Sequence, residues 1–135
     1  MSKNIDVVSS YFKALAGGDH VATAAAFVDD VVWHQPGHSK LSGTFTGKGA
    51  VFAHLGDFGK LSGGTFAIDN ISYVTDNGDL VVAATHFKAE ARGKSLSMQG
   101  IDLFRIKDGK IAEVWLFSEN QSEEDAFWNE LSGNA

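Results

Sequence analysis

The sequence contains no cysteine, and proline occurs only once in its 135 residues. A chain without cysteine has no disulfide, no thiolate nucleophile and no cysteine-ligated zinc or iron–sulfur site. No apolar run approaches the roughly 20 residues that a membrane-spanning helix needs. The first residues, MSKNIDVV, also lack the apolar stretch of a signal peptide. We therefore expect a soluble, cytoplasmic protein without a membrane partner.

Positive charge is also scarce, because 11 Lys and Arg stand against 17 Asp and Glu, for a formal net charge of −6. The basic residues form no cluster, so we expect no nucleic-acid partner. No spacing of His, Asp and Glu resembles a metal-binding triad, and the stretch GTFTGKG lacks the spacing of a phosphate-binding loop. We therefore expect neither a metal nor a cofactor, and a small molecule is the favoured partner.

The rest of the composition is that of an ordinary globular protein, with 44% hydrophobic and 21% charged residues. A chain of this length can bury a substantial core. No repeat, linker or low-complexity tract divides it. The sequence therefore predicts a single domain over residues 1–135.

Three helices are predicted in the first half of the chain. An apolar stripe at helical spacing predicts the first within residues 2–19, and its members are Ile5, Val8, Phe12 and Leu15. Asp19 is placed to cap a second helix over 20–28, and a third is expected over 50–58. Between them, residues 29–37 are typical of a short strand, and residues 39–49 are rich in turn formers.

The second half alternates between apolar and polar residues and predicts four long strands, at roughly 65–75, 80–91, 95–107 and 110–119. Ser122 is expected to cap a short C-terminal helix that ends near residue 131. The order of elements predicts an α+β fold: a cone-shaped, curved antiparallel sheet packed against three N-terminal helices, with a short C-terminal helix. Such a cone has an apolar mouth that suits a small ligand.

One acidic residue falls in an apolar row of the predicted strand at 95–107. Side chains alternate along a strand, so Asp102 shares a face with Phe104 and Ile106. A buried, unpaired carboxylate would cost on the order of several kcal/mol. We therefore expect Asp102 either to be protonated, or to pair with a Lys, an Arg or backbone amides.

Four stretches of the chain resemble a known family in order and spacing: VVSSYFKALAGGD, AAFVDDVVWHQPGHSKLSG, GIDLFRIKDGKI and EVWLFSEN. They resemble the nuclear transport factor 2-like superfamily, in particular the ketosteroid isomerases and the SnoaL-like polyketide cyclases. The resemblance covers nearly the whole chain and implies the same cone. It also implies a homodimer. Because this superfamily uses one cone for several chemistries, the resemblance is stronger for fold than for function.

The resemblance to ketosteroid isomerases implies an oxyanion hole formed by Tyr11 and a protonated Asp102. The aspartate that serves those enzymes as base corresponds here to Gln35, which cannot accept a proton in the relevant pH range. A histidine is the expected substitute base. His38, in a loop, ranks slightly above His34, because strand alternation points His34 away from Gln35.

The chain lacks one feature of many SnoaL-like proteins that it resembles. Many of them carry a His and an Asp on the strand after the Asp–Gly hairpin, and Val114 and Leu116 occupy those positions here. The implied cavity is therefore apolar, with a lining of Trp33, Gln35, Val114, Leu116, and Phe52 or Phe58. We expect it to bind a flat, apolar molecule that bears a carbonyl group.

Two functions remain open at this point. The first is an isomerase that transfers a proton next to the carbonyl of a steroid- or polyketide-like ligand. The second is a non-catalytic binding or accessory protein that has lost the general base. A hydrolase or dehydratase would need an Asp–His or Asp–Arg pair in the cavity, and the sequence indicates none. The other histidines, His20, His54 and His86, are expected to be structural or solvated, with His54 on a surface-leaning helix.

Overall fold

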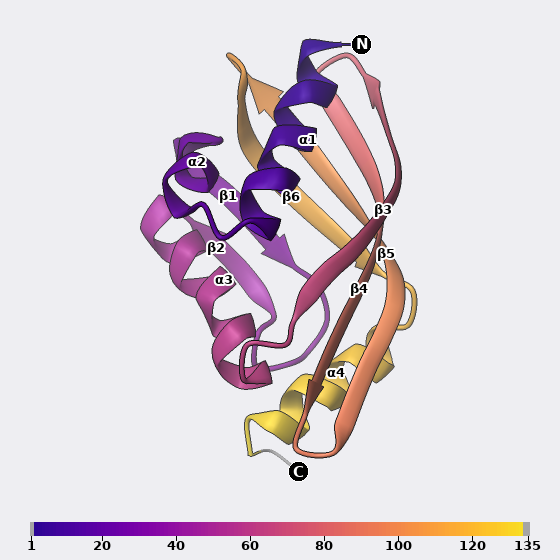
Figure 1. The fold of residues 1–135 in the computed structure, drawn as a ribbon. Coiled ribbons are helices and arrows are strands. Elements are labelled where there is room, and N and C mark those ends of the chain that lie inside the picture. The colour runs from indigo at the N-terminus through magenta and orange to yellow at the C-terminus, as the bar shows by residue number, and fades with distance from the viewer. Residues whose placement is uncertain (1, 134–135) are drawn as a thin grey trace.

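The computed structural model describes residues 2–133, and these form four helices and six strands (Figure 1). The helices are α1 (Lys3–Ala16), α2 (His20–Ala25), α3 (Lys48–Ser62) and α4 (Gln121–Leu131). The strands are β1 (Phe27–Gln35), β2 (Gly43–Thr46), β3 (Ala67–Asn77), β4 (Leu80–Ala91), β5 (Lys94–Lys107) and β6 (Lys110–Ser118). The α+β class predicted from the sequence is confirmed, with helices first, long strands next and a helix at the end.

The strands form one sheet in the order β2-β1-β6-β5-β4-β3. Strands β3 to β6 are an antiparallel meander, as the period-two pattern and its turns predict. The exception is β1, which pairs with β6 in parallel. Tight hairpins force consecutive strands to alternate in direction, whereas a long connection between two strands leaves the direction open. The local pattern therefore could not predict this pair.

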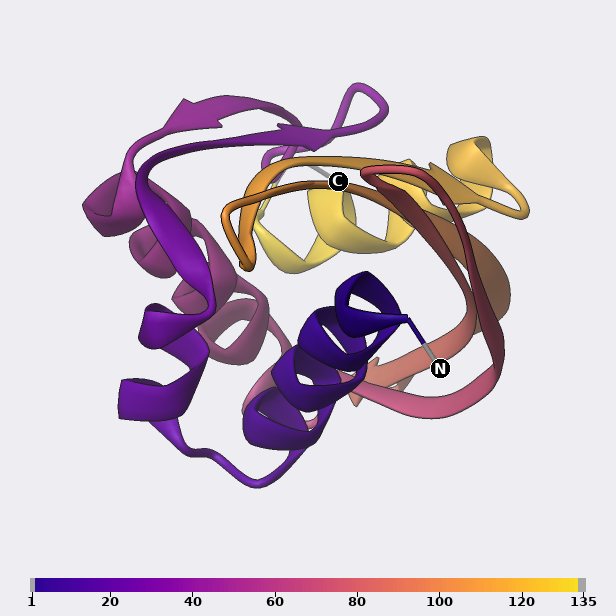
Figure 2. The same cartoon turned by 90° about the horizontal axis from the view of Figure 1, so that it is seen from above.

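The sheet is curved, and the three N-terminal helices lie inside the curve (Figures 1 and 2). Figure 2 shows the strands curling around α1, which packs against β3, β4 and β6. Helix α1 buries the stripe formed by Val8, Tyr11 and Phe12. Helix α3 packs against β1 and β2, and α4 packs against β5, β6 and α3. The helices and the concave face of the sheet thus surround a common space.

Several elements differ from the sequence-based prediction. Helix α2 ends at Ala25, and β1 begins at Phe27, where the sequence predicts helix through residue 28. Residues 43–46, expected to be turns, form β2, which pairs with β1 and extends the sheet. Helix α4 is capped by Asn120, whose side chain accepts a hydrogen bond from the backbone of Glu123, and not by Ser122. Asn and Ser are similarly good caps, so local preference alone could not choose between the two positions.

Helix α3 is longer than predicted and continues through Gly56 and Gly59 to Ser62. Its buried side chains include Val51 and Phe58, and tertiary packing of such a face offsets the low helix propensity of glycine. The helix ends at Gly63, which adopts the left-handed conformation at φ 65° that favours glycine as a C-cap.

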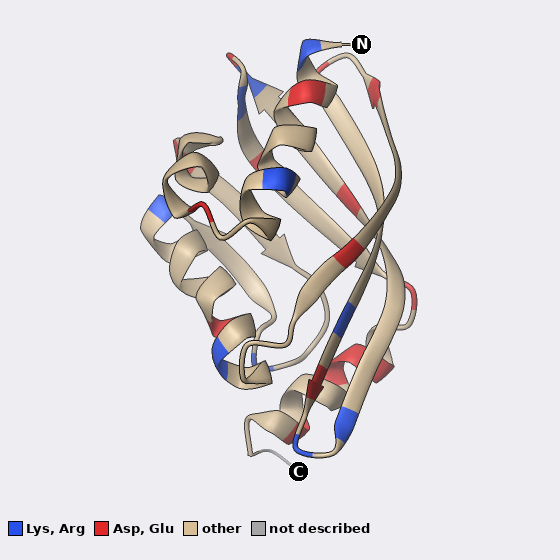
Figure 3. Cartoon of the chain, in the orientation of Figure 1, with Lys and Arg blue, Asp and Glu red and all other residues tan. Residues whose placement is uncertain are grey.

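Acidic and basic residues are spread along the chain, apart from a short acidic run, residues 123–125, at the start of α4 (Figure 3). No helix within residues 2–133 is long and apolar enough to cross a membrane.

Candidate functional site

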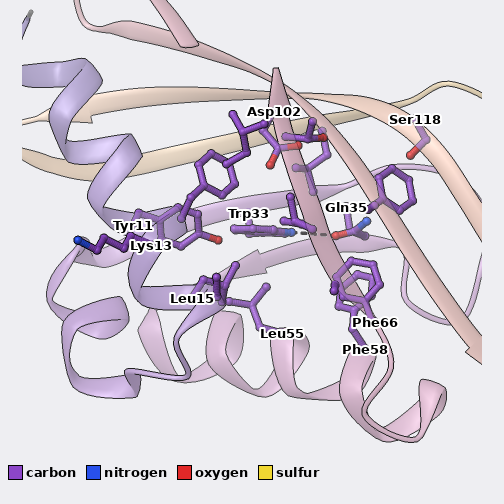
Figure 4. A pocket seen from close by; sticks show the side chains of 18 of the residues that line it. Tyr11, Lys13, Leu15, Trp33, Gln35, Leu55, Phe58, Phe66, Asp102 and Ser118 are labelled. Atoms are coloured by element: carbon purple, nitrogen blue, oxygen red, sulfur yellow. Dashed lines mark hydrogen bonds between the residues drawn. The ribbon is translucent and has the colours of Figure 1, made fainter. Parts of the chain in front are cut away.

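A cavity of about 940 Å³ lies between the concave face of the sheet and helices α1, α3 and α4. Its walls are mainly apolar, with Leu15, Leu55, Phe58 and Phe66 on the helical side (Figure 4). A few polar side chains point into it, and these decide what the cavity can bind.

Tyr11 reaches the cavity from α1. Its ring is buried and contacts Phe12, Phe27 and Phe104, with ring centroids 5.2 to 5.8 Å apart. Burial raises the pKa of the phenol above its usual range, and the nearby charge of Asp102 raises it further. The hydroxyl is therefore protonated at neutral pH and available as a hydrogen-bond donor.

Asp102 reaches the same cavity from the middle of β5, between Ala83 of β4 and Leu116 of β6. The residue is only 8% exposed. Within residues 2–133 its carboxyl group has no Lys, Arg or backbone amide as a partner, so the paired alternative raised by the sequence does not apply. Burial raises the pKa of Asp102 to about 7, and the charge of Glu124 adds to this effect. Asp102 therefore stays largely protonated below neutral pH.

A second carboxyl group, that of Glu124 on α4, also lines the cavity. Its Oε1 accepts hydrogen bonds from Ser118 Oγ at 2.6 Å and Gln121 Nε2 at 3.2 Å, and its Oε2 accepts one from Trp128 Nε1 at 3.1 Å. Three donors and no acceptor suit a carboxylate. The cavity therefore holds one acid without hydrogen-bond partners in the described chain and one carboxylate with three.

Gln35 lies at the other end of Trp33 from Tyr11 (Figure 4). Its Oε1 accepts hydrogen bonds from Trp33 Nε1 at 2.9 Å and from His54 Nε2 at 3.0 Å. His54 is 2% exposed and stacks on Phe45, with ring centroids 4.0 Å apart. Burial lowers the pKa of His54 to about 4, although Asp57 opposes the effect, so the ring is neutral at pH 7.

Comparison with known proteins shows the family to which this fold belongs. The family model of the SnoaL-like domain matches residues 8–114. The chain belongs to this family. A protein of unknown function with a cystatin-like fold from Xanthomonas campestris is 44% identical, with a TM-score of 0.89 and coverage of 93% of this chain and 97% of that one. An uncharacterized protein of Mycobacterium tuberculosis is 28% identical and covers 93% of this chain and 95% of its own length.

The wider fold is also confirmed. A protein described as NTF2-like and of unknown function, from Burkholderia pseudomallei, has a TM-score of 0.81 at 19% identity, with coverage of 95% of this chain and 98% of that one. The SnoaL-like match includes Tyr11, Trp33, Gln35 and Asp102 but ends before Glu124. The wall that α4 contributes to the cavity therefore lies outside the matched region.

The SnoaL-like cavity brings together six of the predicted site residues: Tyr11, Trp33, Gln35, Phe58, Asp102 and Leu116. Two predicted lining residues lie elsewhere. Val114 is fully buried in the core, and Phe52 packs in the same core against Phe27. Phe52 and Phe58 lie six positions apart on α3, so a helix of 3.6 residues per turn points them in different directions.

The two predicted bases lie outside the cavity of this SnoaL-like domain. His34 is on the opposite face of β1, where its Nε2 lies 2.7 Å from Glu113 Oε2 and its ring stacks on Trp115. His38 is exposed in the loop after Pro36, and its backbone N–H donates to Asp125 on α4 at 2.9 Å. Strand alternation points His34 away from the cavity. The hydrogen bond between the loop and α4 holds His38 outside it.

The sequence interpretation missed two buried polar residues of the site, although their spacing gave a signal: Glu124 lines the cavity, and His54 is bonded to the lining residue Gln35. His54 lies at positions i+3 and i−4 from Val51 and Phe58, within an apolar helical stripe. Glu124 lies three and four residues before Phe127 and Trp128, again on the buried face. A polar residue inside an apolar stripe is buried, and it therefore needs a partner.

One further histidine forms a cluster outside the cavity. On the outer face of the sheet, His86 Nδ1 lies 2.6 Å from Asp69 Oδ1, and His86 Nε2 lies 2.9 Å from Ser97 Oγ. The hydrogen bond to His86 lowers the pKa of Asp69. Within residues 2–133, no group of three or more His, Asp and Glu is placed to hold a metal ion.

Proposed function

We propose that this SnoaL-like domain binds a flat, largely apolar molecule through a carbonyl oxygen and promotes proton transfer at the neighbouring carbon. The carbonyl oxygen would accept hydrogen bonds from Tyr11 and Asp102. The observation that supports the proposal is that a phenol and a carboxyl group with a raised pKa line one apolar cavity, close enough for the charge of Asp102 to affect the pKa of Tyr11. A steroid- or polyketide-like molecule has the required shape and chemistry.

Two neutral donors at one oxygen suit a reaction that develops negative charge there. When a proton leaves the carbon next to a carbonyl, the oxygen becomes an enolate. Donors that are already oriented stabilise this charge without a reorganisation cost, and an apolar surrounding strengthens the effect. The rings of Tyr11 and Phe12 on α1 contact Phe104 on β5, and Tyr11 and Asp102 are both buried, so packing within the protein holds their side chains.

The proton also needs an acceptor, and Glu124 is the candidate. It is a carboxylate in the cavity lining, whereas His34 and His38 lie outside the cavity. The proton would move from the carbon to a carboxylate oxygen of Glu124 and return to the conjugated carbon, while Tyr11 and Asp102 keep their own protons.

Non-catalytic binding is the second candidate, and a specific observation favours it. The oxygens of Glu124 already accept three hydrogen bonds, so an oxygen that took up a proton would have to give up at least one of these donors. Gln35 occupies the position that corresponds to the base of ketosteroid isomerases. A protein of this kind would hold its ligand at Tyr11 and Asp102 without transferring a proton.

Replacing Tyr11 by phenylalanine should weaken the binding of a ketone without affecting that of a hydrocarbon. The probes are 1-tetralone and tetralin, which differ by one carbonyl oxygen. Loss of one hydrogen bond predicts a roughly three- to ten-fold weaker affinity for 1-tetralone, measured by NMR titration. Thr75→Val is the control, because it removes a hydroxyl at an exposed position outside the cavity lining. Equal affinities of the parent protein and Tyr11→Phe for 1-tetralone would contradict the donor role.

Turnover of a β,γ-unsaturated ketone distinguishes the two candidates. We expect 3-cyclohexen-1-one to be converted to the conjugated enone, followed by ultraviolet absorbance, with a rate that falls as pH rises above about 7, where Asp102 loses its proton. Asp102→Asn should remove this fall. His38→Ala should leave the rate unchanged, because His38 lies outside the cavity. Binding of 1-tetralone without any turnover would support the non-catalytic candidate.

A further inference from the structure

The amide of Gln35 can adopt only one orientation. Trp33 Nε1 carries a hydrogen and can only donate, so the Gln35 atom that faces it at 2.9 Å is the oxygen. The second partner, His54 Nε2, lies 3.0 Å from the same oxygen. Because an amide oxygen only accepts, His54 must carry its proton on Nε2. A flipped amide would place its NH₂ group against the N–H of Trp33, which cannot accept a hydrogen bond.

This orientation leaves the nitrogen of Gln35 facing the cavity. Gln35 belongs to the cavity lining, and within residues 2–133 its Nε2 makes no hydrogen bond. Figure 4 shows the oxygen directed toward Trp33 and the nitrogen directed away from it. The position that corresponds to the base of ketosteroid isomerases therefore presents two N–H donors to a ligand.

The donors of the cavity lie at separate places. Tyr11 and Asp102 come from α1 and β5, whereas Gln35 comes from β1, and Trp33 lies between Tyr11 and Gln35 (Figure 4). A flat ring system resting along Trp33 would therefore meet hydrogen-bond donors at both of its ends.

We propose that Gln35 is a specificity-determining residue that binds a second acceptor oxygen, so that the ligand class is a flat molecule with oxygens at opposite ends, such as a quinone or a diketone. This inference rests on the proposed function, in which Tyr11 and Asp102 hold the first oxygen. The buried hydrogen bonds of Trp33 and His54 are what hold the amide in place.

The test compares two ligands with the same fused two-ring skeleton that carry one or two ring carbonyl groups. 1,4-Naphthoquinone has a carbonyl at each end of one ring, whereas 1-tetralone has only one carbonyl. The protein has no cysteine, so the quinone has no thiol to react with. We expect the parent protein to bind 1,4-naphthoquinone about three- to ten-fold more tightly than 1-tetralone in NMR titrations, the effect of one added hydrogen bond.

The variant Gln35→Glu isolates the amide nitrogen. At pH 8 the carboxylate keeps an acceptor for Trp33 and His54 but replaces the NH₂ group with an oxygen. In this variant we expect 1,4-naphthoquinone to bind no more tightly than 1-tetralone. Gln99→Glu makes the same change at an exposed position outside the cavity lining, and it should keep the higher affinity for the quinone. A quinone advantage that survives in Gln35→Glu would overturn the inference.

The two proposals fail in different ways. If 1-tetralone binds and depends on Tyr11, but the parent protein does not prefer the quinone, the proposed function stands and the role of Gln35 is wrong. If neither compound binds, both are wrong. Should Gln35→Glu not fold, the side-chain amide signals of Gln35 in the parent protein provide the measurement. They should shift when 1,4-naphthoquinone is added and stay in place with tetralin, and the absence of a shift with the quinone would contradict the inference.

Discussion

Replacing Asp102 by asparagine is expected to remove a loss of stability that the protein suffers between about pH 4 and pH 7. The pKa of Asp102 is raised from 3.8 to about 7, mainly by burial and also by the charge of Glu124. Below pH 3.8 the group is protonated in both the folded and the unfolded states. Between the two values only the folded state keeps the proton, so the free energy of unfolding falls as pH rises. The fall amounts to about 4 kcal/mol and is complete above the folded-state value.

The measurement is urea unfolding of the parent protein and Asp102→Asn at pH 4 and pH 8. Asparagine has nearly the shape of the protonated acid, so the two proteins should differ little at pH 4. At pH 8 the variant should be more stable by about 2 to 4 kcal/mol, since it has no charge to bury. Asp30→Asn, at an exposed position, controls for the change in net charge. A variant that is less stable than the parent at pH 8 would show that the carboxylate of Asp102 is stabilised in the folded protein.

Replacing Glu124 by alanine is expected to destabilise the protein by about 3 kcal/mol, because three hydrogen bonds are lost and their donors stay behind. Trp128, whose Nε1 donates to Glu124, is only 1% exposed, so its N–H has no access to bulk water. Ser118 on β6 and Gln121 on α4 also lose their acceptor. Glu124 thus ties α4 to the sheet at the edge of the cavity.

Urea unfolding at pH 7 provides the measurement for Glu124→Ala. Glu123→Ala is the matched control, because the neighbouring Glu123 is exposed on the same turn of α4 and should change the free energy of unfolding by less than about 0.5 kcal/mol. Equal effects of the two substitutions would contradict the structural role of Glu124. Loss of the Glu124 charge should also lower the pKa of Asp102, so the pH-dependent fall in stability should end at a lower pH.

Where the sequence predicted the placement of a side chain correctly, the signal was local. Asp102 lies on the buried face of β5 because strand alternation puts it beside Phe104 and Ile106. Tyr11 lies on the buried side of α1, next to Phe12. In β1, the same alternation points Trp33 and Gln35 into the cavity. Each placement depends on a few neighbouring residues, so the local sequence pattern was enough to predict it.

The interpretation failed where a side chain depends on a distant segment. His54 was expected on a surface-leaning helix, yet it is buried between Phe45 and Phe58 and bonded to Gln35. The helical stripe indicated that it faces inward, but nothing local indicated that an amide on β1 would meet it. The direction of β1 against β6 has the same cause, because strands joined by a long connection are free to pair either way.

The amino-acid sequence by itself determined most of the elements and their buried faces, because helical and strand periods are properties of neighbouring residues. That Tyr11 and Asp102 share one apolar space was implied by the resemblance to a known family. Only the tertiary structure decided which groups share the cavity with them. It turned His34 toward Glu113 and held the loop of His38 on α4. It also brought Glu124 to the cavity wall, since a contact between distant segments depends on the packing of the whole chain.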